Sequence, residues 1–320
     1  MRHKSNSDAC TPLSGRPTCG LKPLIIRALF CAFCLSSVSL GASKGHANKP
    51  TLRLCTGSPS GHYYGVGKII AQAISRDISV EMLSTQGSWE NLGLIHGIYN
   101  SPRRCDAIIA QDDAVAVYLY EHQESIGAIE AISPLYQEYI QIVCNRQVKA
   151  ERLNELTPDT RMLVGGQGTG TFITWTLVKR LIPQIYSMLS TQKLGGAKGL
   201  DRLVSVDQPQ CLLFVQALAQ GLLTRINDDA RLSEQLHFLH IDDRAFQYPI
   251  NQGGVARILY RADHVHRNVY PKVLQDHLRT QTVDAVLYLH RDWSVENPQL
   301  ARSIRELTVS MRSRIQRYVH

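Results

Sequence analysis

The sequence lacks several features that would assign it quickly to a class. After residue 47, no apolar run is long enough to cross a bilayer as a helix. No serine stands in the Gly-x-Ser-x-Gly turn of an α/β-hydrolase, and the glycine-rich turn at residues 165–171 has no lysine of the kind found in phosphate-binding loops. These absences argue against a membrane-spanning protein, a hydrolase with that turn and a nucleotide-binding enzyme.

Residues suited to a metal site are also missing. The cysteines after residue 47 lie far apart in the sequence, whereas zinc sites use closely spaced pairs. Four histidines, His237, His240, His264 and His266, have no carboxylate at a spacing that would complete a site. We therefore expect no metal and no cofactor.

The distribution of positive charge disfavours nucleic-acid binding. The formal net charge is +8, but residues 1–47 hold six of the 35 basic residues and one of the 27 acidic ones, so the remainder carries only +3. The arginines between Arg302 and Arg317 are typical of a terminal helix whose charges face water. Nucleic acid is therefore not an expected partner.

The first 47 residues have the order of a secretory signal peptide. Basic residues come first, an apolar run extends from Ala28 to Leu40, and small residues follow up to Ala47. Cleavage after Ala47 or after Ser43 fits this pattern. The sequence thus predicts export to the periplasm without a permanent anchor.

Four cysteines remain after such a cleavage. Cys55, Cys105, Cys144 and Cys211 each lie in or beside an apolar, strand-like run. An oxidising compartment allows disulfides such as one between Cys144 and Cys211, and buried free thiols are the alternative.

From residue 51 onward, short apolar runs alternate with helical patterns, which is typical of parallel sheets covered by helices. Strands are expected at residues 52–56, 79–83, 106–111, 129–133, 138–145, 162–165, 212–216, 237–241, 255–260 and 283–290. Helices are expected at residues 64–76, 89–99, 114–121, 172–181 and 298–318. The strand, turn and helix order begins anew near residue 162, which predicts an α/β fold of two lobes, residues 48–140 with 245–320 and residues 141–244.

Four polar turns follow expected strands, at residues 56–64, 84–91, 111–113 and 165–171. Open α/β sheets hold ligands at the carboxyl ends of their strands. Glycines in such turns permit close approach of the backbone, and free amides at the following helix N-termini favour an anionic or strongly polar small molecule. Trp89 either stacks over the ligand or packs in the core, and one of Tyr63 and Tyr64 is expected to line the cleft while the other packs.

Together the four turns resemble a known family. The segments TGSPSGHYY (56–64), STQGSWEN (84–91), AQDD (110–113) and GQGTGT (166–171) are similar, in this order, to TAXI-type solute receptors of TRAP transporters. The resemblance covers residues 51–180 best. It departs at His62 and Trp89, which are larger than the residues expected there, and at Asp112, which makes its turn more acidic.

The resemblance implies a type II periplasmic-binding-protein clamshell with mostly parallel sheets and no catalytic activity. Such a receptor closes on a small organic acid or an amino acid such as glutamate and delivers it to an ion-driven TRAP permease in the membrane. By position, the resemblance gives a ligand-facing role to Gly57, Ser58, Tyr63, Tyr64, Ser88, Asn91, Gln111, Asp113, Thr169 and Thr171. Further candidates are Trp89, Gly168 and Asp207, the last with Gln208 in the less similar second lobe.

A monomeric transport receptor is therefore the leading hypothesis. An extracytoplasmic sensor or adaptor of the same fold is the second. A secreted hydrolase using Ser60, His62 and Asp112 or Asp113 is the third, and no spacing in the sequence supports that triad. The acidic turn of Asp112 and Asp113 is also a candidate for binding the ammonium group of an amino acid.

Overall fold

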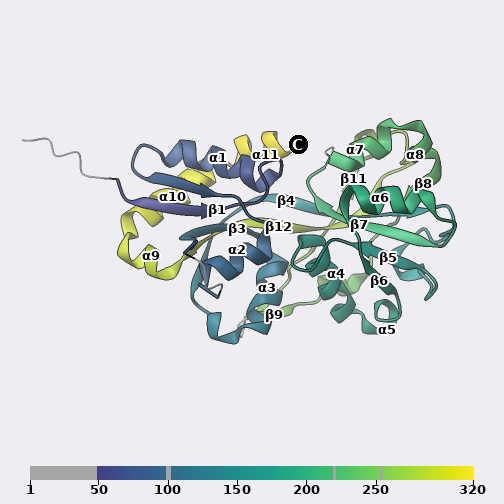
Figure 1. The fold of residues 1–320 in the computed structure, drawn as a ribbon, viewed down its shortest axis with the longest axis horizontal. Coiled ribbons are helices and arrows are strands. Elements are labelled where there is room, and N and C mark those ends of the chain that lie inside the picture. Colours follow the sequence, from purple (N-terminus) through teal and green to yellow (C-terminus); the bar gives the residue numbers. More distant parts are fainter. Residues whose placement is uncertain (1–48, 99–101, 219–220, 253–254) are drawn as a thin grey trace, which may run out of the picture. The chain divides into compact units, whose positions relative to one another are not determined.

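One mixed β-sheet organises the described part of the chain (Figure 1). The computed structural model describes residues 49–98, 102–218, 221–252 and 255–320, so the predicted signal peptide lies outside the described residues. The ten strands follow the order β2-β1-β3-β12-β4-β7-β5-β6, with β11 beside β12 and β8 beside β4. The predicted two-lobed α/β fold is confirmed, with parallel strands at both ends of the sheet and antiparallel strands between them.

The first lobe begins with three parallel strands, each followed by a helix. The strands are β1 (Thr51–Cys55), β2 (Ser79–Leu83) and β3 (Ala107–Gln111), and the helices are α1 (His62–Ile74), α2 (Ser88–Ile95) and α3 (Asp112–Glu121), with the short η1 (Gln123–Ser125) after them. In α1, Val66, Ile69, Ile70 and Ile74 recur at helical spacing and are buried, which fixes the face that packs on the sheet.

Two long strands cross from one lobe to the other. Residues 129–140 of β4 (Ile129–Asn145) pair with β12 (Leu278–His290), and residues 139–144 of β4 pair with β7. The sequence predicted two separate strands here, at residues 129–133 and 138–145. In the structure Pro134 lies beside a register shift, where a strand can bulge and tolerate a residue without a backbone N–H.

The second lobe repeats the strand, turn and helix order. Its strands are β5 (Arg161–Val164), β6 (Ser190–Lys193), β7 (Gln210–Gln216) and β8 (Leu236–Phe238). Its helices are α4 (Gly170–Leu181), α5 (Pro183–Tyr186), α6 (Gly196–Ser205), α7 (Gly221–Asp228) and α8 (Ala230–Gln235), with the single turns η2 (Leu153–Glu155) and η3 (Arg244–Gln247).

The C-terminal part differs in detail from the prediction. It contains β9 (Ile250–Gln252), β10 (Val255–Arg257), β11 (Arg261–Val265), η4 (Arg267–Val269), α9 (Arg291–Glu296), α10 (Pro298–Ser310) and α11 (Arg312–Val319). The expected strand 255–260 is the short β10, which pairs with β9 alone, and the expected terminal helix is two helices that meet at Met311.

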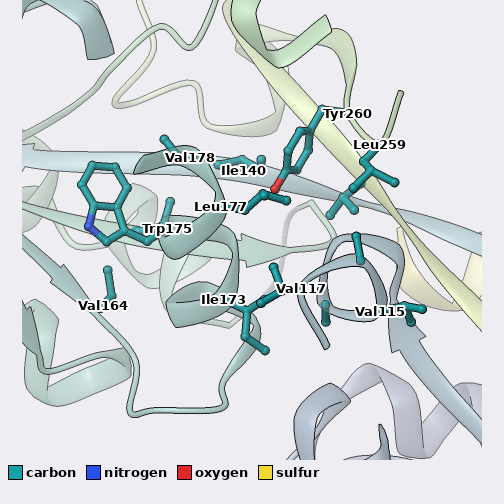
Figure 2. Packing of buried hydrophobic residues seen from close by; sticks show 14 of the residues in the cluster. Val115, Val117, Ile140, Val164, Ile173, Trp175, Leu177, Val178, Leu259 and Tyr260 are labelled. Carbon is teal, nitrogen blue, oxygen red and sulfur yellow. The ribbon is translucent and has the colours of Figure 1, made fainter. Parts of the chain in front are cut away.

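Three hydrophobic clusters form the core. One joins α2 and α3 to α4, and Figure 2 shows Val115 and Val117 of α3 in the same cluster as Ile173 and Leu177 of α4. A second lies under α1, α10 and α11, on the other side of β1 from α2 and α3 (Figure 1). The third holds Val265 and Leu278 together with Leu212 and Leu223 of the second lobe. Residues 265–278 therefore pack with the second lobe, because β11 pairs with the first half of β12, and not with the first lobe as the sequence predicted.

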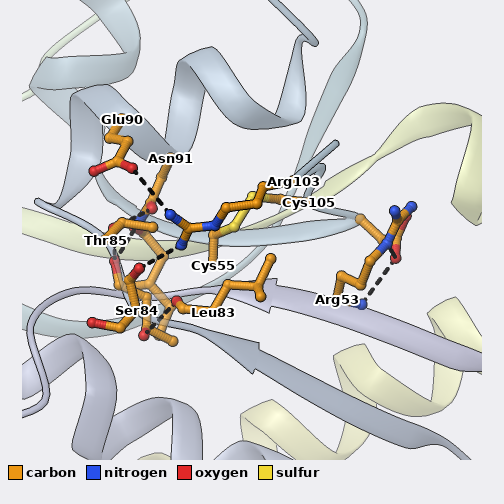
Figure 3. Close-up of a disulfide and its surroundings, with 12 residues drawn as sticks. Arg53, Cys55, Leu83, Ser84, Thr85, Glu90, Asn91, Arg103 and Cys105 are labelled. Atoms are coloured by element: carbon orange, nitrogen blue, oxygen red, sulfur yellow. Dashed lines mark hydrogen bonds and ion pairs between the residues drawn. A yellow bond between two sulfur atoms is a disulfide. The ribbon is translucent and has the colours of Figure 1, made fainter. Parts of the chain in front are cut away.

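Both pairs of cysteines form disulfides, so of the two alternatives left open by the sequence, disulfides and buried free thiols, the first holds. Cys144 on β4 stands directly opposite Cys211 on β7, as the sequence allowed. Cys55 at the end of β1 is bonded to Cys105, just before the neighbouring strand β3 (Figure 3). The first disulfide braces the second lobe, and the second fixes the strand end that leads into the turn at residues 56–61.

No helix within the described ranges is long and apolar enough to span a membrane.

Removal of the Cys144–Cys211 bond should destabilise the protein. The bond closes a loop between residues 67 apart in sequence, and cross-links of this kind contribute about 2–4 kcal/mol by restricting the unfolded chain. We expect the Cys144→Ala, Cys211→Ala double variant to lose stability in this range during urea unfolding. Equal midpoints for the wild-type and the double variant would contradict the structural role.

Candidate ligand-binding site

A cleft of about 600 Å³ lies where the polar turns of both lobes meet. Its first wall is formed by the turns after β1 and β2 with the end of β3, and its second wall by the turn after β5 and the end of β7. Seven predicted residues line it: Gly57, Ser58, Tyr63, Ser88, Gln111, Thr169 and Thr171. The parallel order of β1, β2 and β3 brings the turns of the first wall to one edge of the sheet.

Helix N-termini supply the hydrogen-bond donors of these walls. The first turns of α1 and α2 begin at Gly61 and Gly87, neither of which caps its helix with a side chain, so backbone N–H groups are available. Gly87 has a φ of 111°, a backbone conformation that favours glycine. On the facing wall, α4 starts at Thr169, whose hydroxyl accepts from the Phe172 amide. Two uncapped N-termini at one cleft favour a carboxylate or another anion.

The floor of the cleft carries a buried acid that the sequence analysis did not identify. Glu138 on β4 is 6% exposed, and its carboxyl accepts from the hydroxyls of Tyr63 and Tyr136, each at 3.3 Å. Burial is the largest cause that raises its pKa, to about 8, and the nearby acid Asp113 adds to the effect. The carboxyl is therefore mostly protonated at neutral pH when the cleft holds no cation.

A chain of polar contacts connects Glu138 to the first wall. Tyr63 Oη lies 3.3 Å from Ser88 Oγ, and Ser88 Oγ accepts from the backbone N–H of Gln111 at 3.1 Å. The side-chain Nε2 of Gln111 is buried and has no hydrogen-bond partner within the described residues. A methyl group at Gly170 would overlap Gln111 Oε1, so the glycine makes room for this amide between the walls. Gln111 Nε2 is thus a buried donor without a partner among the described residues, in a side chain that borders the cleft.

An arginine lies at the edge of the same cleft. Arg103 donates to the carbonyl of Ser84 at 2.7 Å and lies 3.9 Å from the Glu90 carboxylate (Figure 3). Ser84 directly follows β2 and Glu90 lies in the first turn of α2, so these two contacts hold the guanidinium against the cleft wall. It adds positive charge beside the uncapped N-termini.

Two predicted ligand-facing residues serve the structure instead. The Asn91 side chain is fully buried, where it donates to the carbonyls of Thr56 and Ile109 and accepts from the Thr85 hydroxyl. It ties together the ends of β1, β2 and β3. Asp113 is also buried, accepts from Thr174 and Tyr260, and does not line the cleft.

The remaining candidates lie elsewhere. Trp89 and Gly168 border neighbouring hollows, and Trp89 packs edge-on against Tyr118 with ring centroids 5.1 Å apart. Tyr64 lies under the Lys68 ammonium on α1. Asp207 lines a separate hollow formed by the end of β4, α6 and α8, and the carbonyl of the next residue, Gln208, accepts from Asn145.

Sequence reasoning missed Glu138, Arg103 and Gln216, which also line the cleft. Glu138 and Gln216 stand in strands, and Arg103 precedes one, so no turn pattern marked them. The signal available for Glu138 was a lone acid within an otherwise apolar strand, because acids are rarely buried without a specific reason.

The described residues contain no group of three or more His, Cys, Asp or Glu side chains able to hold a metal ion.

The described part of the chain has the two-lobed α/β fold that is found in solute-binding proteins. A solved ancestral arginine-binding protein, bound to arginine, shares this fold with a TM-score of 0.51 at 11% sequence identity, over 85% of this chain and 98% of that one. The GluR0 ligand-binding core with L-glutamate aligns at a TM-score of 0.47 and 12% identity, over 86% and 100% of the two chains. The substrate-binding protein AbpA from Streptococcus pneumoniae, bound to L-arginine, aligns at 0.46 and 11% identity, over 84% and 92%.

The sequence itself places the chain in a family. The model of the NMT1-like family matches residues 54–293, and the chain belongs to that family.

The raised pKa of Glu138 predicts a pH-dependent stability. Since its pKa is about 8 in the folded protein against a usual 4.5, the folded state holds a proton that the unfolded state loses between these values. The contribution to the free energy of unfolding is therefore full below about pH 4.5, falls as the pH rises, and is lost above about pH 8. Glu138→Gln removes this titration, so the variant should gain stability relative to wild type between about pH 5 and about pH 8, by on the order of a few kcal/mol.

Urea unfolding at a series of pH values measures this difference. The control is Glu130→Gln on the same strand, where the carboxylate is partly exposed and lies 3.9 Å from Arg305. If the difference in the free energy of unfolding between Glu138→Gln and wild type stayed constant across that range, the pKa of Glu138 would not be raised.

Proposed function

We propose that this protein is an extracytoplasmic solute receptor that captures a small organic acid or amino acid in the cleft and performs no catalysis. The observation that carries the proposal is the meeting of two uncapped helix N-termini, Gln111 Nε2 and Arg103 at one cleft between two lobes. These donors suit a carboxylate. The solute-binding fold supports the same function, and so does the arginine bound by its structural relative.

We infer further that the receptor serves a TRAP-type membrane permease and works as a monomer in the periplasm. The support for the permease is the resemblance of the four polar turns to TAXI-type receptors. The signal-peptide pattern and the two disulfides support the compartment, because disulfides persist in oxidising environments. Cell fractionation of the expressed full chain tests the compartment, and retention in the cytoplasm would contradict it.

The hydrolase hypothesis has little support in the geometry. Asp112 accepts from Tyr288 at 2.6 Å and from Arg257 at 2.7 Å, and Asp113 accepts from Thr174 and Tyr260. Neither acid lines the cleft, so neither is placed to orient a histidine there.

Calorimetry on the mature chain, against amino acids and matched mono- and dicarboxylic acids, tests the binding function. We expect at least one compound with a carboxylate to bind, and neutral sugars not to bind. Silence across the whole panel would refute the proposal.

Replacement of Gln111 should lower the affinity for the ligand without unfolding the protein. Gln111→Met keeps the length of the side chain and removes the Nε2 donor, which should weaken binding about fivefold, or about 1 kcal/mol for one hydrogen bond. The control is Gln141→Met, at a buried glutamine on β4 that does not line the cleft. If Gln111→Met and wild type bound the ligand with equal affinity, Gln111 would not donate a hydrogen bond to the ligand.

A further inference from the structure

Glu138 occupies a particular place in the sheet. It pairs with Val283 on β12, and the next residue along β4, Tyr139, pairs with Gln216 on β7. Its carboxyl therefore lies on the floor of the cleft at the point where β4 passes from one lobe to the other. A ligand held by both walls has this group beneath it.

The polar groups of the cleft are unequally distributed between walls and floor. The walls present backbone amides, hydroxyls, the Gln111 amide and Arg103, which together suit the negative end of a ligand. The other lining carboxylate, Glu90, already accepts from the Gln86 amide at 2.8 Å and faces Arg103. Among the described residues, by contrast, Glu138 is hydrogen-bonded only to neutral phenols, and the charged group that acts on it is a second acid, Asp113. A cation beside Glu138 would lower the cost of ionising this buried carboxyl.

We propose that Glu138 selects ligands that carry a cationic amino group as well as a carboxylate, so that the cleft takes amino acids in preference to simple organic acids. The inference rests on the proposed function and narrows it. The ligand carboxylate contacts the helix N-termini, and its ammonium group donates to the Glu138 carboxylate. The sequence predicted the acidic turn at residues 112–113 as a candidate for binding the ammonium group. We assign this role to Glu138 instead, because Asp112 accepts from Tyr288 and Asp113 accepts from Thr174.

Binding of such a ligand is coupled to proton release. In the free protein the Glu138 carboxyl holds its proton at neutral pH, since burial raises its pKa to about 8. The ligand ammonium favours the ionised form, so the proton passes to solvent as the ammonium arrives. The groups that face Glu138 are Tyr63 from α1, Tyr136 from β4 and Asp113 from α3. The His62 ring lies edge-on to Tyr136, with ring centroids 6.2 Å apart.

The sign of the pH effect follows from this exchange. Affinity for an amino acid should rise by up to tenfold per pH unit as the pH approaches about 8 from below, and then level off. The pKa of Asp113 is raised to about 6, so its titration affects the lower end of this range. The matched acid without an amino group gains nothing from the ionised carboxylate and should not show the rise.

Titration calorimetry of the mature chain with matched pairs tests the inference. The pairs are L-glutamate with glutarate, and L-alanine with propionate, and a panel of the other amino acids with their deaminated acids extends them. Each titration is repeated at about pH 7 in buffers of different ionisation enthalpy, which counts the protons exchanged. We expect the amino acid of at least one pair to bind at least tenfold more tightly than its partner and to release close to one proton.

The variant Glu138→Gln should lose both the proton release and at least tenfold of the discrimination. Glu130→Gln, on the same strand, should keep both. Tight binding of a deaminated acid, with its amino acid bound equally or more weakly, would overturn the role of Glu138 and leave the proposed function intact. Absence of binding by every compound would overturn the proposed function, and this inference with it. If Glu138→Gln does not fold, the proton count on the wild-type chain decides.

Discussion

The buried carboxyl of Glu138, with the two phenol hydroxyls that donate to it, is the interaction on which the cleft depends. An acid taken out of water destabilises the fold when it is ionised, and two hydrogen bonds from tyrosines offset only part of that cost. The group lies on β4, a strand that both lobes share. In the proposed complex, a ligand whose ammonium group pairs with Glu138 would therefore stabilise the contact between the lobes at the point where they join, and so favour a closed state.

The rest of the cleft is built by one local pattern used several times. A strand ends, a turn with glycine and hydroxyl residues follows, and a helix starts; α1 and α2 start without a side-chain cap, and α4 starts with the Thr169 hydroxyl as its cap. Asn91 holds the first three of these strand ends together through the carbonyls of Thr56 and Ile109 and the hydroxyl of Thr85. The Cys55–Cys105 bond fixes the first strand end covalently. Rigid turns of this kind can hold a small anion without long charged side chains.

The sequence predicted those features of the cleft that depend on neighbouring residues in the chain, above all the polar turns that follow the strands. The glycines and hydroxyls after β1, β2 and β5 mark the turns in the sequence, and four of the residues predicted from them, Tyr63, Ser88, Gln111 and Thr169, line one cleft in the structure. Pairing between distant strands was beyond such reasoning. Which face Glu138 presents depends on the register of β4 with β12 and on the shift beside Pro134, and which cysteines meet depends on strand order. Asn91 and Asp113 followed the same pattern as true cleft residues, but neighbouring strands and helices enclose them.

In the proposed complex, one small molecule is held with its carboxylate at the N-termini of α1 and α2 and its amino group at Glu138. A crystal structure of the mature chain with its tightest-binding amino acid tests this most directly. We expect the ligand nitrogen within hydrogen-bond distance of the Glu138 carboxylate and the ligand carboxylate against the amides near Gly61 and Gly87. A ligand bound in the reverse orientation, or outside this cleft, would contradict it.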